Sequence, residues 1–303
     1  MLDDPATAIS QVRRFNRTVT EGIGVLDSHF MGRDRPVGEA RLLWEIGTGG
    51  VEVRALRARL GLDSGYVSRV LRSLERHKLV RVRASGADGR VRYASLTKAG
   101  LAERAELDRL SDSLASRILE PLNERQRATL LAAMSDIERL IEASMVRFAV
   151  EDPESPEAKW CLEQYFAELN ERFDGGFDAS HSQPTLPSEA RPPAGAFVIA
   201  RLRGRPIGCG LVKCPPREPA HIRRMWVAPS VRGLGVGRRL LQELERQARE
   251  CGARIVRLDT NRKLIQAIDM YRRSGYVEVQ AFSTEPYAHH WFEKRLPPTA
   301  KRA

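Results

Sequence analysis

The sequence has few cysteines and few aromatic residues, and it lacks any long apolar run. Its four cysteines form no C-x-x-C pair and its six histidines form no H-E-x-x-H pattern, which argues against a disulfide scaffold or a common zinc site. No stretch reaches the ~18–20 apolar residues that a membrane-spanning helix needs. The first four residues, MLDD, are acidic and do not resemble a secretory signal. We therefore expect a cytoplasmic protein with reduced thiols, no metal and no membrane partner.

The length of 303 residues exceeds what one hydrophobic core usually supports, which predicts two domains. Two prolines and four acidic residues fall within residues 149–158, a composition that interrupts helices and cores. We expect a first domain at 1–147, a linker at 148–158 and a second domain at 159–303. A second stretch rich in proline and glycine, residues 174–195, predicts a long loop inside the second domain.

The positive charge is concentrated in one segment. The chain has a net charge of +11, and residues 54–98 alone carry 12 Lys and Arg against three Asp and Glu, a net of +9. The rest of residues 1–150 has 13 basic and 17 acidic residues, a net of −4. A basic excess within 45 residues predicts a surface that binds a polyanion.

The same segment has the pattern of a helix-turn-helix. Gly61 ends one short helix and Asp63 can cap the next, whose buried stripe is Val67, Val70, Leu71 and Leu74. With that stripe buried, the outer face of the helix carries the polar and basic residues Ser64, Tyr66, Ser68, Arg69 and Arg72. Two alternating segments around the polar tip at 84–89 then predict a β-hairpin with an arginine-rich rim.

These features resemble the MarR family of winged helix-turn-helix regulators over residues 1–147. The resemblance rests on V67-S-R-x-x-x-x-L-E75, the wing motif D88-G-R90 and L96-T-x-x-G100. It departs at Lys78, where the family usually has glycine. It implies binding of double-stranded DNA, with Ser64, Tyr66, Ser68 and Arg69 at the major groove and Arg72 also among the DNA-binding residues. It also implies Arg90 in the minor groove, held there by Asp88.

Apolar faces on the first helix and on the last helix of this half exceed the needs of one small domain. MarR relatives use such surface to dimerise. We therefore expect a homodimer on a pseudo-palindromic operator, with recognition helices ~34 Å apart. The alternative is that this surface covers the second domain.

In the second half, a glycine-rich segment at residues 232–237 (RGLGVG) follows a predicted strand and opens a helix. Free amides and the helix dipole at such a start bind anions. A Walker-type loop is excluded because no G-K-S/T follows, and a dinucleotide fingerprint would need a short first βα turn.

The segment resembles the R/Q-x-x-G-x-G/A pyrophosphate loop of GNAT N-acetyltransferases, and A267-x-x-x-Y271-x-x-x-G-Y276 resembles their second acyl-CoA motif. The resemblance implies an α+β fold with a central, mostly antiparallel twisted sheet, following the mainly-α winged domain. It implies that acetyl-CoA is held by Val227, Arg232, Gly233, Leu234, Gly235, Val236, Gly237 and Arg238.

The resemblance also suggests catalytic groups. Tyr271 is the expected general acid that protonates the departing CoA thiolate. Relatives often place a glutamate where this chain has His221, which we take as the candidate general base, with Glu218 and Glu278 as alternatives. We expect a DNA-binding regulator fused to an acetyl-CoA-dependent N-acetyltransferase, acting on an unspecified primary amine by direct attack in a ternary complex. Two alternatives are an acyl-CoA sensor without turnover and a plain enzyme whose first half only dimerises.

Overall fold

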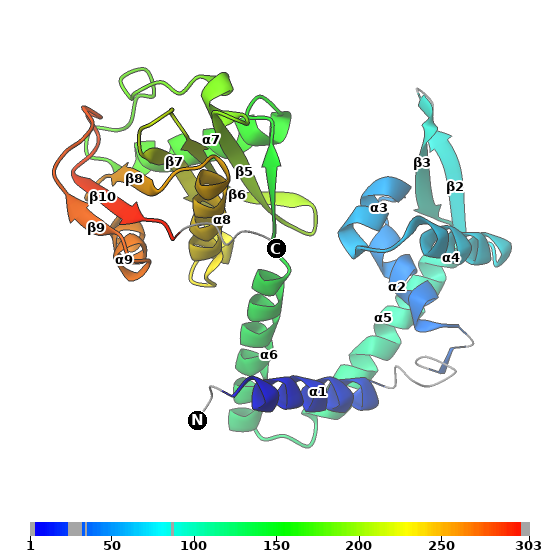
Figure 1. The fold of residues 1–303 in the computed structure, drawn as a ribbon. Coiled ribbons are helices and arrows are strands. Elements are labelled where there is room, and N and C mark those ends of the chain that lie inside the picture. Colours follow the sequence, from blue (N-terminus) through cyan, green and yellow to red (C-terminus); the bar gives the residue numbers. More distant parts are fainter. Residues whose placement is uncertain (1–3, 24–31, 34, 86–87, 298–303) are drawn as a thin grey trace. The chain divides into compact units, whose positions relative to one another are not determined.

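The computed structural model describes residues 4–23, 32–33, 35–85 and 88–297. The chain divides into two compact units, Met1–Ala133 and Met134–Ala303, and each is described by itself (Figure 1). Helix α6 (Glu124–Ser144) begins in the first unit and ends in the second.

The first unit is mainly helical and carries a small antiparallel sheet. Besides the start of α6, its elements are α1 (Pro5–Gly22), α2 (Val37–Ile46), β1 (Val51–Glu52), α3 (Val53–Leu60), α4 (Ser64–Arg76), β2 (Val80–Ser85), β3 (Asp88–Leu96) and α5 (Lys98–Leu119). The strands are ordered β1-β3-β2. This arrangement confirms the winged helix-turn-helix fold, with β2 and β3 as the wing.

Helices α3 and α4 form the expected helix-turn-helix. Gly61 has a φ of 64° and ends α3, a left-handed conformation that glycine adopts without strain. The Asp63 side chain accepts a hydrogen bond from the Tyr66 amide (2.9 Å) and caps α4. The buried face of the pair packs into the core of the unit and comprises Leu56, Val67, Leu71 and Leu74.

Lys78 shows how the chain ends α4 without the glycine usual in the MarR family. Lys78 has a φ of 59°. Its amide donates to the Glu75 carbonyl and the Leu79 amide donates to the Leu74 carbonyl, both at 2.9 Å. The same tight turn therefore forms, but a residue with a Cβ is strained there by about 1 kcal/mol.

We expect Lys78→Gly to raise the free energy of unfolding by about 0.5–1 kcal/mol, because glycine removes the strain but has more freedom in the unfolded chain. Urea titration measures this change. Lys78→Ala removes the same charge and keeps the Cβ, so it serves as the control and should bring no comparable gain. An equal gain in both variants would assign the effect to the lysine side chain and contradict the backbone explanation.

The second unit is built on a twisted sheet of seven strands in the order β4-β5-β6-β7-β8-β10-β9. The strands are β4 (Arg147–Glu151), β5 (Gly195–Leu202), β6 (Arg205–Lys213), β7 (Ala220–Val227), β8 (Ile255–Thr260), β9 (Val277–Val279) and β10 (His290–Arg295). All neighbours pair antiparallel except β7 and β8. This confirms the predicted α+β fold with a mostly antiparallel sheet.

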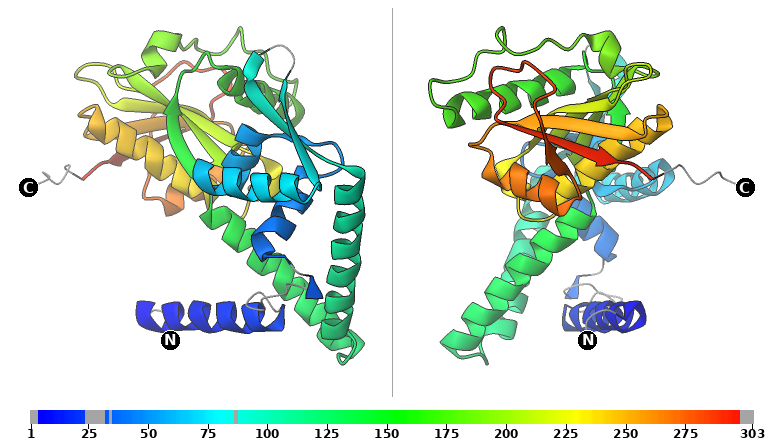
Figure 2. Two further views of the ribbon diagram at one scale, coloured as in Figure 1. Left: turned by 90° about the vertical axis from the view of Figure 1, so that its right-hand side faces the viewer. Right: turned by 60° about the vertical axis from the view of Figure 1, so that its left-hand side comes forward.

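Helices cover both faces of this sheet. Helix α7 (Pro156–Arg172) lies on one face, and α8 (Val236–Glu250) and α9 (Ile265–Arg273) lie on the other (Figure 2). Leu240, Leu241 and Leu244 of α8 are fully buried against the strands. Cys161 of α7 packs with Phe197 on the opposite face. The residues between these layers form the core that fixes the ends of β7 and β8.

The structure differs from the expected linker at 148–158. Residues 147–151 form β4, the edge strand that pairs with β5, and α7 begins at Pro156. The acidic residues that suggested a linker are paired: Glu151 with Arg201 and Asp152 with Arg191. Because these partners are distant in sequence, the local composition did not predict the strand. The functional division between residues 1–147 and 159–303 stays a prediction.

Candidate functional site

The second unit is open where its two parallel strands separate. Strands β7 and β8 pair only at Ala220 with Val256 and at His221 with Arg257. Beyond this point a cavity of about 620 Å³ lies between the end of β7, the loop before α8, and helices α7 and α9. Its size is within the range of small-molecule and cofactor pockets.

The loop before α8 supplies the glycines that line this cavity. Gly233 and Gly235 have φ values of 77° and 75°, and Gly235 is the N-cap of α8. An added Cβ would meet open space at both positions, so the backbone conformation is what requires glycine there. The free amides of the first turn of α8 therefore start at the loop that lines the cavity.

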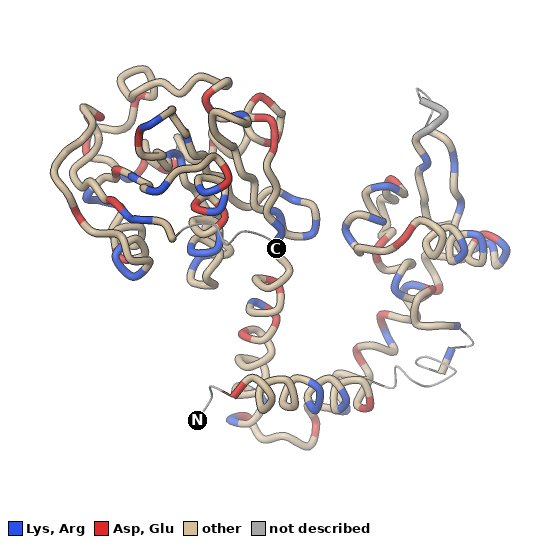
Figure 3. The backbone as a smooth tube through the Cα atoms, in the orientation of Figure 1, with Lys and Arg blue, Asp and Glu red and all other residues tan. Residues whose placement is uncertain are grey.

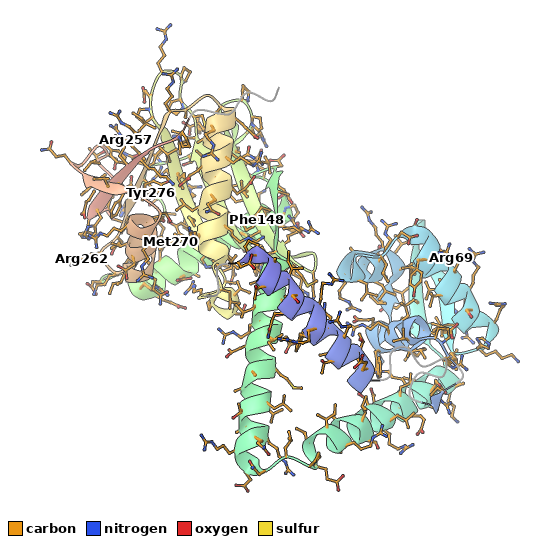
Figure 4. The ribbon with its side chains drawn as sticks, turned by 60° about the horizontal axis from the view of Figure 1, so that its bottom comes forward. Arg69, Phe148, Arg257, Arg262, Met270 and Tyr276 are labelled. Atoms are coloured by element: carbon orange, nitrogen blue, oxygen red, sulfur yellow. The ribbon has the colours of Figure 1, made fainter. Side chains whose placement is uncertain are left out.

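The other residues predicted to bind the cofactor lie in different surroundings. An added Cβ on Gly237 would lie 3.3 Å from Met270 Sδ, a tight contact that a small shift of the methionine could relieve. Figure 4 shows Met270 on α9. The side chains of Leu234 and Val236 pack into an apolar cluster, which leaves only their backbone for a ligand. Arg238 lines the cavity.

Arg232 fastens the loop to its surroundings. Its Nε donates to the Val227 carbonyl (2.9 Å), and its Nη2 pairs with Glu168 of α7. The Glu168 carboxylate also accepts from Trp226 Nε1 (2.9 Å). Arg232 therefore holds the end of β7, the glycine loop and α7 together.

The Val227 amide points into the opening. Val227 lies opposite Gly208 of β6, and the next amide, that of Ala228, donates to the Ile207 carbonyl (2.8 Å). This makes Gly208 and Val227 a non-hydrogen-bonded pair. The Val227 N–H therefore faces away from β6, toward the side where β8 has separated.

Tyr271 of α9 lines both this cavity and a smaller one of about 90 Å³. Its ring packs against Tyr276 and Phe292, with centroids 6.0 Å apart in each pair. Burial and the nearby Asp259 carboxylate raise the pKa of Tyr271. The phenol therefore stays protonated at neutral pH and is placed between the two cavities.

His221 lies one contact away from the small cavity. Its Nε2 is 3.1 Å from Asp259 Oδ2, within ion-pair distance. Asp259 lines the cavity and His221 does not. Burial raises the pKa of Asp259, but the contact with His221 and the charges of His221 and Arg223 outweigh it, so the pKa falls below its ordinary value.

The two alternative bases lie elsewhere. Glu278 is on the edge strand β9, paired with Arg272 (2.9 Å) and His290 (2.6 Å). Glu218 lines a separate cavity next to Cys214 and Cys251.

Several residues of the small cavity were not predicted from the sequence, namely Tyr165, Arg223, Arg224, Asp259 and Glu285. They come from α7, β7, β8 and the segment before β10. The only signal in the sequence was a carboxylate at the end of a predicted strand, Leu258-Asp259. Phe177 and Ser182 of the loop at 174–195 also line this cavity.

In the first unit, α4 presents the candidate nucleic-acid surface. Ser64, Arg69 and Arg72 are exposed and Ser68 is half-buried. Basic residues lie along both strands of the hairpin of β2 and β3 (Figure 3). Among them, Arg81, Arg83 and Arg92 are exposed. Tyr66 differs: an added Cβ on Gly38 of α2 would lie 2.2 Å from its hydroxyl, so Tyr66 packs back onto α2.

Asp88 and Arg90 belong to β3, but their side chains lie outside the described part of the chain. The expected ion pair between them stays a prediction. Within the described ranges, no helix is long and apolar enough to cross a membrane. The same ranges contain no group of three or more His, Cys, Asp or Glu side chains suited to a metal ion.

Two family models match the chain. Residues 33–91 match the MarR family, and residues 162–276 match the acetyltransferase (GNAT) family. The chain is therefore a fusion of a MarR-like segment with a GNAT-like segment, as the sequence predicted.

Known proteins resemble parts of the chain. A 92-residue region is 34% identical to an IAA acetyltransferase of Azospirillum brasilense and covers 30% of this chain and 59% of that protein. The matched regions of the curated relatives span 39–59% of their lengths. A GNAT acetyltransferase structure from Staphylococcus aureus is 17% identical, covering 50% of this chain and 99% of that chain with a TM-score of 0.43. A variant of MarR from Escherichia coli complexed with operator DNA is 20% identical, covering 45% and 99% with a TM-score of 0.37.

Proposed function

We propose that this protein is a DNA-binding regulator fused to an N-acetyltransferase that moves acetyl from acetyl-CoA to a primary amine. The observation that carries the proposal is the placement of Tyr271 between two adjoining cavities, one of which the glycine loop lines. The larger cavity suits the acyl donor, and the smaller one suits the amine.

The chain's own groups fit the donor. The amides of residues 234–238 would hold the diphosphate at the start of α8, because this end of a helix attracts anions. The Val227 amide would bind the pantetheine arm or the thioester carbonyl, and there it would stabilise the oxyanion that forms during attack. Arg232 would position both through the bonds of its Nε and Nη2, and its remaining donors face the cavity that it lines.

The protons that move during the reaction define the roles of His221, Asp259 and Tyr271. An ammonium ion in the small cavity loses one proton before attack. Asp259, which lines the cavity, accepts this proton and passes it to His221, the general base. The neutral amine then forms the N–C bond while the C–S bond breaks, and Tyr271 gives its proton to the thiolate. The second proton on the nitrogen restores Tyr271. The products are an amide, CoA thiol and one released proton.

The first unit would bind double-stranded DNA through α4 and the wing. Exposed Arg69 and Arg72 form no ion pair with any described carboxylate, which leaves them available to phosphates and bases. Asp63 fixes the start of α4, the end that meets base edges in this fold.

The test of the enzymatic function is amine-dependent release of CoA thiol from acetyl-CoA, run beside selection of bound DNA from random sequences. We expect both thiol release and a pseudo-palindromic operator with salt-dependent affinity. Binding of acetyl-CoA that shifts operator affinity without thiol release would replace the enzyme by a sensor. Thiol release without sequence-selective DNA binding would leave only the enzyme.

We also propose a homodimer. The stripe Ile9, Val12, Phe15 and Val19 of α1 is 40–60% exposed, and no described residue of α1 is buried. Helix α6 has a comparable stripe of Leu131, Met134, Leu140 and Ile141, which Met145 directly after the helix extends, at 46–61% exposure. Apolar helical surface of this extent is typical of a covered interface.

Val12→Glu is expected to convert the dimer to a monomer, raising the dissociation constant at least about a hundredfold, because a carboxylate would be buried unpaired on each chain. Sedimentation velocity of the full chain measures it. Gln11→Glu adds the same charge beside the stripe and should leave the dimer intact. A natural chain that sediments as a monomer would contradict the proposal.

A further inference from the structure

Glu285 lines the small cavity, and one of its carboxylate oxygens has no hydrogen-bond partner among the described residues. Glu285 exposes only 6% of its side chain. Its Oε2 accepts from Arg223 Nη2 (2.6 Å), Ser182 Oγ (2.9 Å) and the Gln183 amide (3.0 Å). Its Oε1 is buried and has no donor among the described residues. A buried acceptor without a partner is unfavourable by about 1–3 kcal/mol, so this site lacks a hydrogen-bond donor.

The same cavity contains a cation without an anion. Arg224 is half-buried and lies over the Phe166 ring, 5.5 Å from its centroid. No described carboxylate pairs with it; Arg223, its neighbour, takes Glu285 instead. Burial and the charge of Arg223 lower the pKa of Arg224. The side chain therefore has unused donors and an uncompensated positive charge at the cavity wall.

A bulge in β7 brings both arginines to this cavity. Adjacent strand residues normally point to opposite faces, but the register of β6 and β7 shifts between Cys209 and Leu211, and Arg224 has a φ of 53°. Bulges redirect side chains in this way. The strained backbone at Arg224 therefore places a second guanidinium beside the cavity, in addition to that of Arg223.

We propose that the amine acceptor is a compact amino-carboxylate, a short amino acid whose carboxylate binds Arg224 and whose amine binds Glu285 Oε1 and Asp259. This inference rests on the proposed acetyltransferase function and names its substrate class. The ligand supplies both groups that the site lacks, a donor cation and an anion. The volume of about 90 Å³ has room for only a few water molecules, so the acceptor is short.

The site also limits what else the acceptor carries. Phe166, Phe173, Phe177 and Tyr287 line the cavity beside the polar groups. Their rings accept a methylene or methyl group and offer no further hydrogen-bond acceptors except the Tyr287 hydroxyl, which already donates to and accepts from Asp178 backbone atoms. Glycine, alanine and β-alanine meet these limits.

The first experiment compares thiol release with glycine, alanine and β-alanine against ethylamine and ethanolamine, which have an amine but no carboxylate. The expected kcat/KM is at least about tenfold higher for the amino-carboxylates, the loss that follows from removing one charge-assisted hydrogen bond. Equal rates for amines with and without a carboxylate would overturn the substrate class and leave the acetyltransferase function standing. No thiol release with any amine would overturn both.

The second experiment tests Arg224 directly. Arg224→Gln should raise the KM for glycine at least about tenfold and leave that for ethanolamine unchanged, while Arg224→Lys should keep the preference. Calorimetry of glycine binding to the CoA-loaded protein gives a readout without turnover, and Arg224→Gln should abolish that binding. Arg262→Gln, at an exposed arginine outside both cavities, is the control. Equal weakening of all amines by Arg224→Gln would show a structural role and contradict the proposal. If that variant does not fold, the comparison of amines in the natural protein decides.

Discussion

Tyr271→Phe is expected to reduce acetyl transfer about a hundredfold while acetyl-CoA binds with unchanged affinity. Removing the hydroxyl removes the proton donor for the thiolate, and general acids contribute ~10²–10⁴ in rate. The lower end applies because burial and Asp259 raise the pKa of Tyr271, which makes it a weak acid relative to a thiol of ordinary pKa near 8.5. The same shift places the loss of activity of the natural protein above about pH 10, as pH rises through the pKa of the phenol.

Steady-state kinetics of thiol release and calorimetry with CoA separate the two effects. Tyr276→Phe is the matched control, because Tyr276 packs against Tyr271 but lines neither cavity. Tyr165→Phe is the sharper comparison, since Tyr165 lines both cavities and its pKa is also raised by burial. A loss in Tyr165→Phe that equals or exceeds the loss in Tyr271→Phe would move the acid to α7.

The parts of the molecule that the sequence predicted are those encoded locally. Gly61 ends the first helix of the helix-turn-helix, and Asp63, two residues later, caps the second. The six residues 232–237 likewise contain the loop and the start of α8. Their φ values and caps depend on the residue itself and its immediate neighbours. Such signals can be found without knowing the tertiary structure.

The small cavity could not be predicted because its polar groups come from separate segments. Glu285 meets Arg223 across 62 positions and Ser182 across 103. The bulge that turns Arg224 depends on the register between β6 and β7, which no local pattern encodes. The edge strand β4 was missed for the same reason, since Glu151 at its end and Asp152 just after it have their partners elsewhere in the chain.

The second large effect is expected on operator binding when Arg69, which we propose contacts base edges, is replaced. Arg69→Ala is expected to weaken specific operator binding by about 2–6 kcal/mol, roughly 30-fold to 10⁴-fold, because a good base contact contributes about 1–3 kcal/mol and a dimer uses two copies. Arg69 is exposed on α4 (Figure 4), next to the Asp63-capped start of the helix. Binding to unrelated DNA should change little, since phosphate contacts supply it.

Arg72 provides the internal comparison. Its Nε donates to the Ser68 carbonyl (3.2 Å), which turns the guanidinium back along α4. Arg72→Ala should therefore weaken binding to all sequences alike and lower the slope of affinity against salt by about one for each phosphate that is no longer neutralised. Gel shifts on the selected operator and on unrelated DNA, each over a salt series, measure both variants.

Arg90→Ala should behave like Arg69→Ala if the wing enters the minor groove. Arg262→Ala removes the same charge from an exposed position in the second unit and is the control. None of these variants should change acetyl transfer, since no described residue of α4 or the wing lines either of the two cavities. Loss of acetyl transfer with intact operator affinity in Arg69→Ala or Arg90→Ala would contradict this division of labour. Loss of operator affinity alone would assign DNA recognition to the first unit and the chemistry to the second.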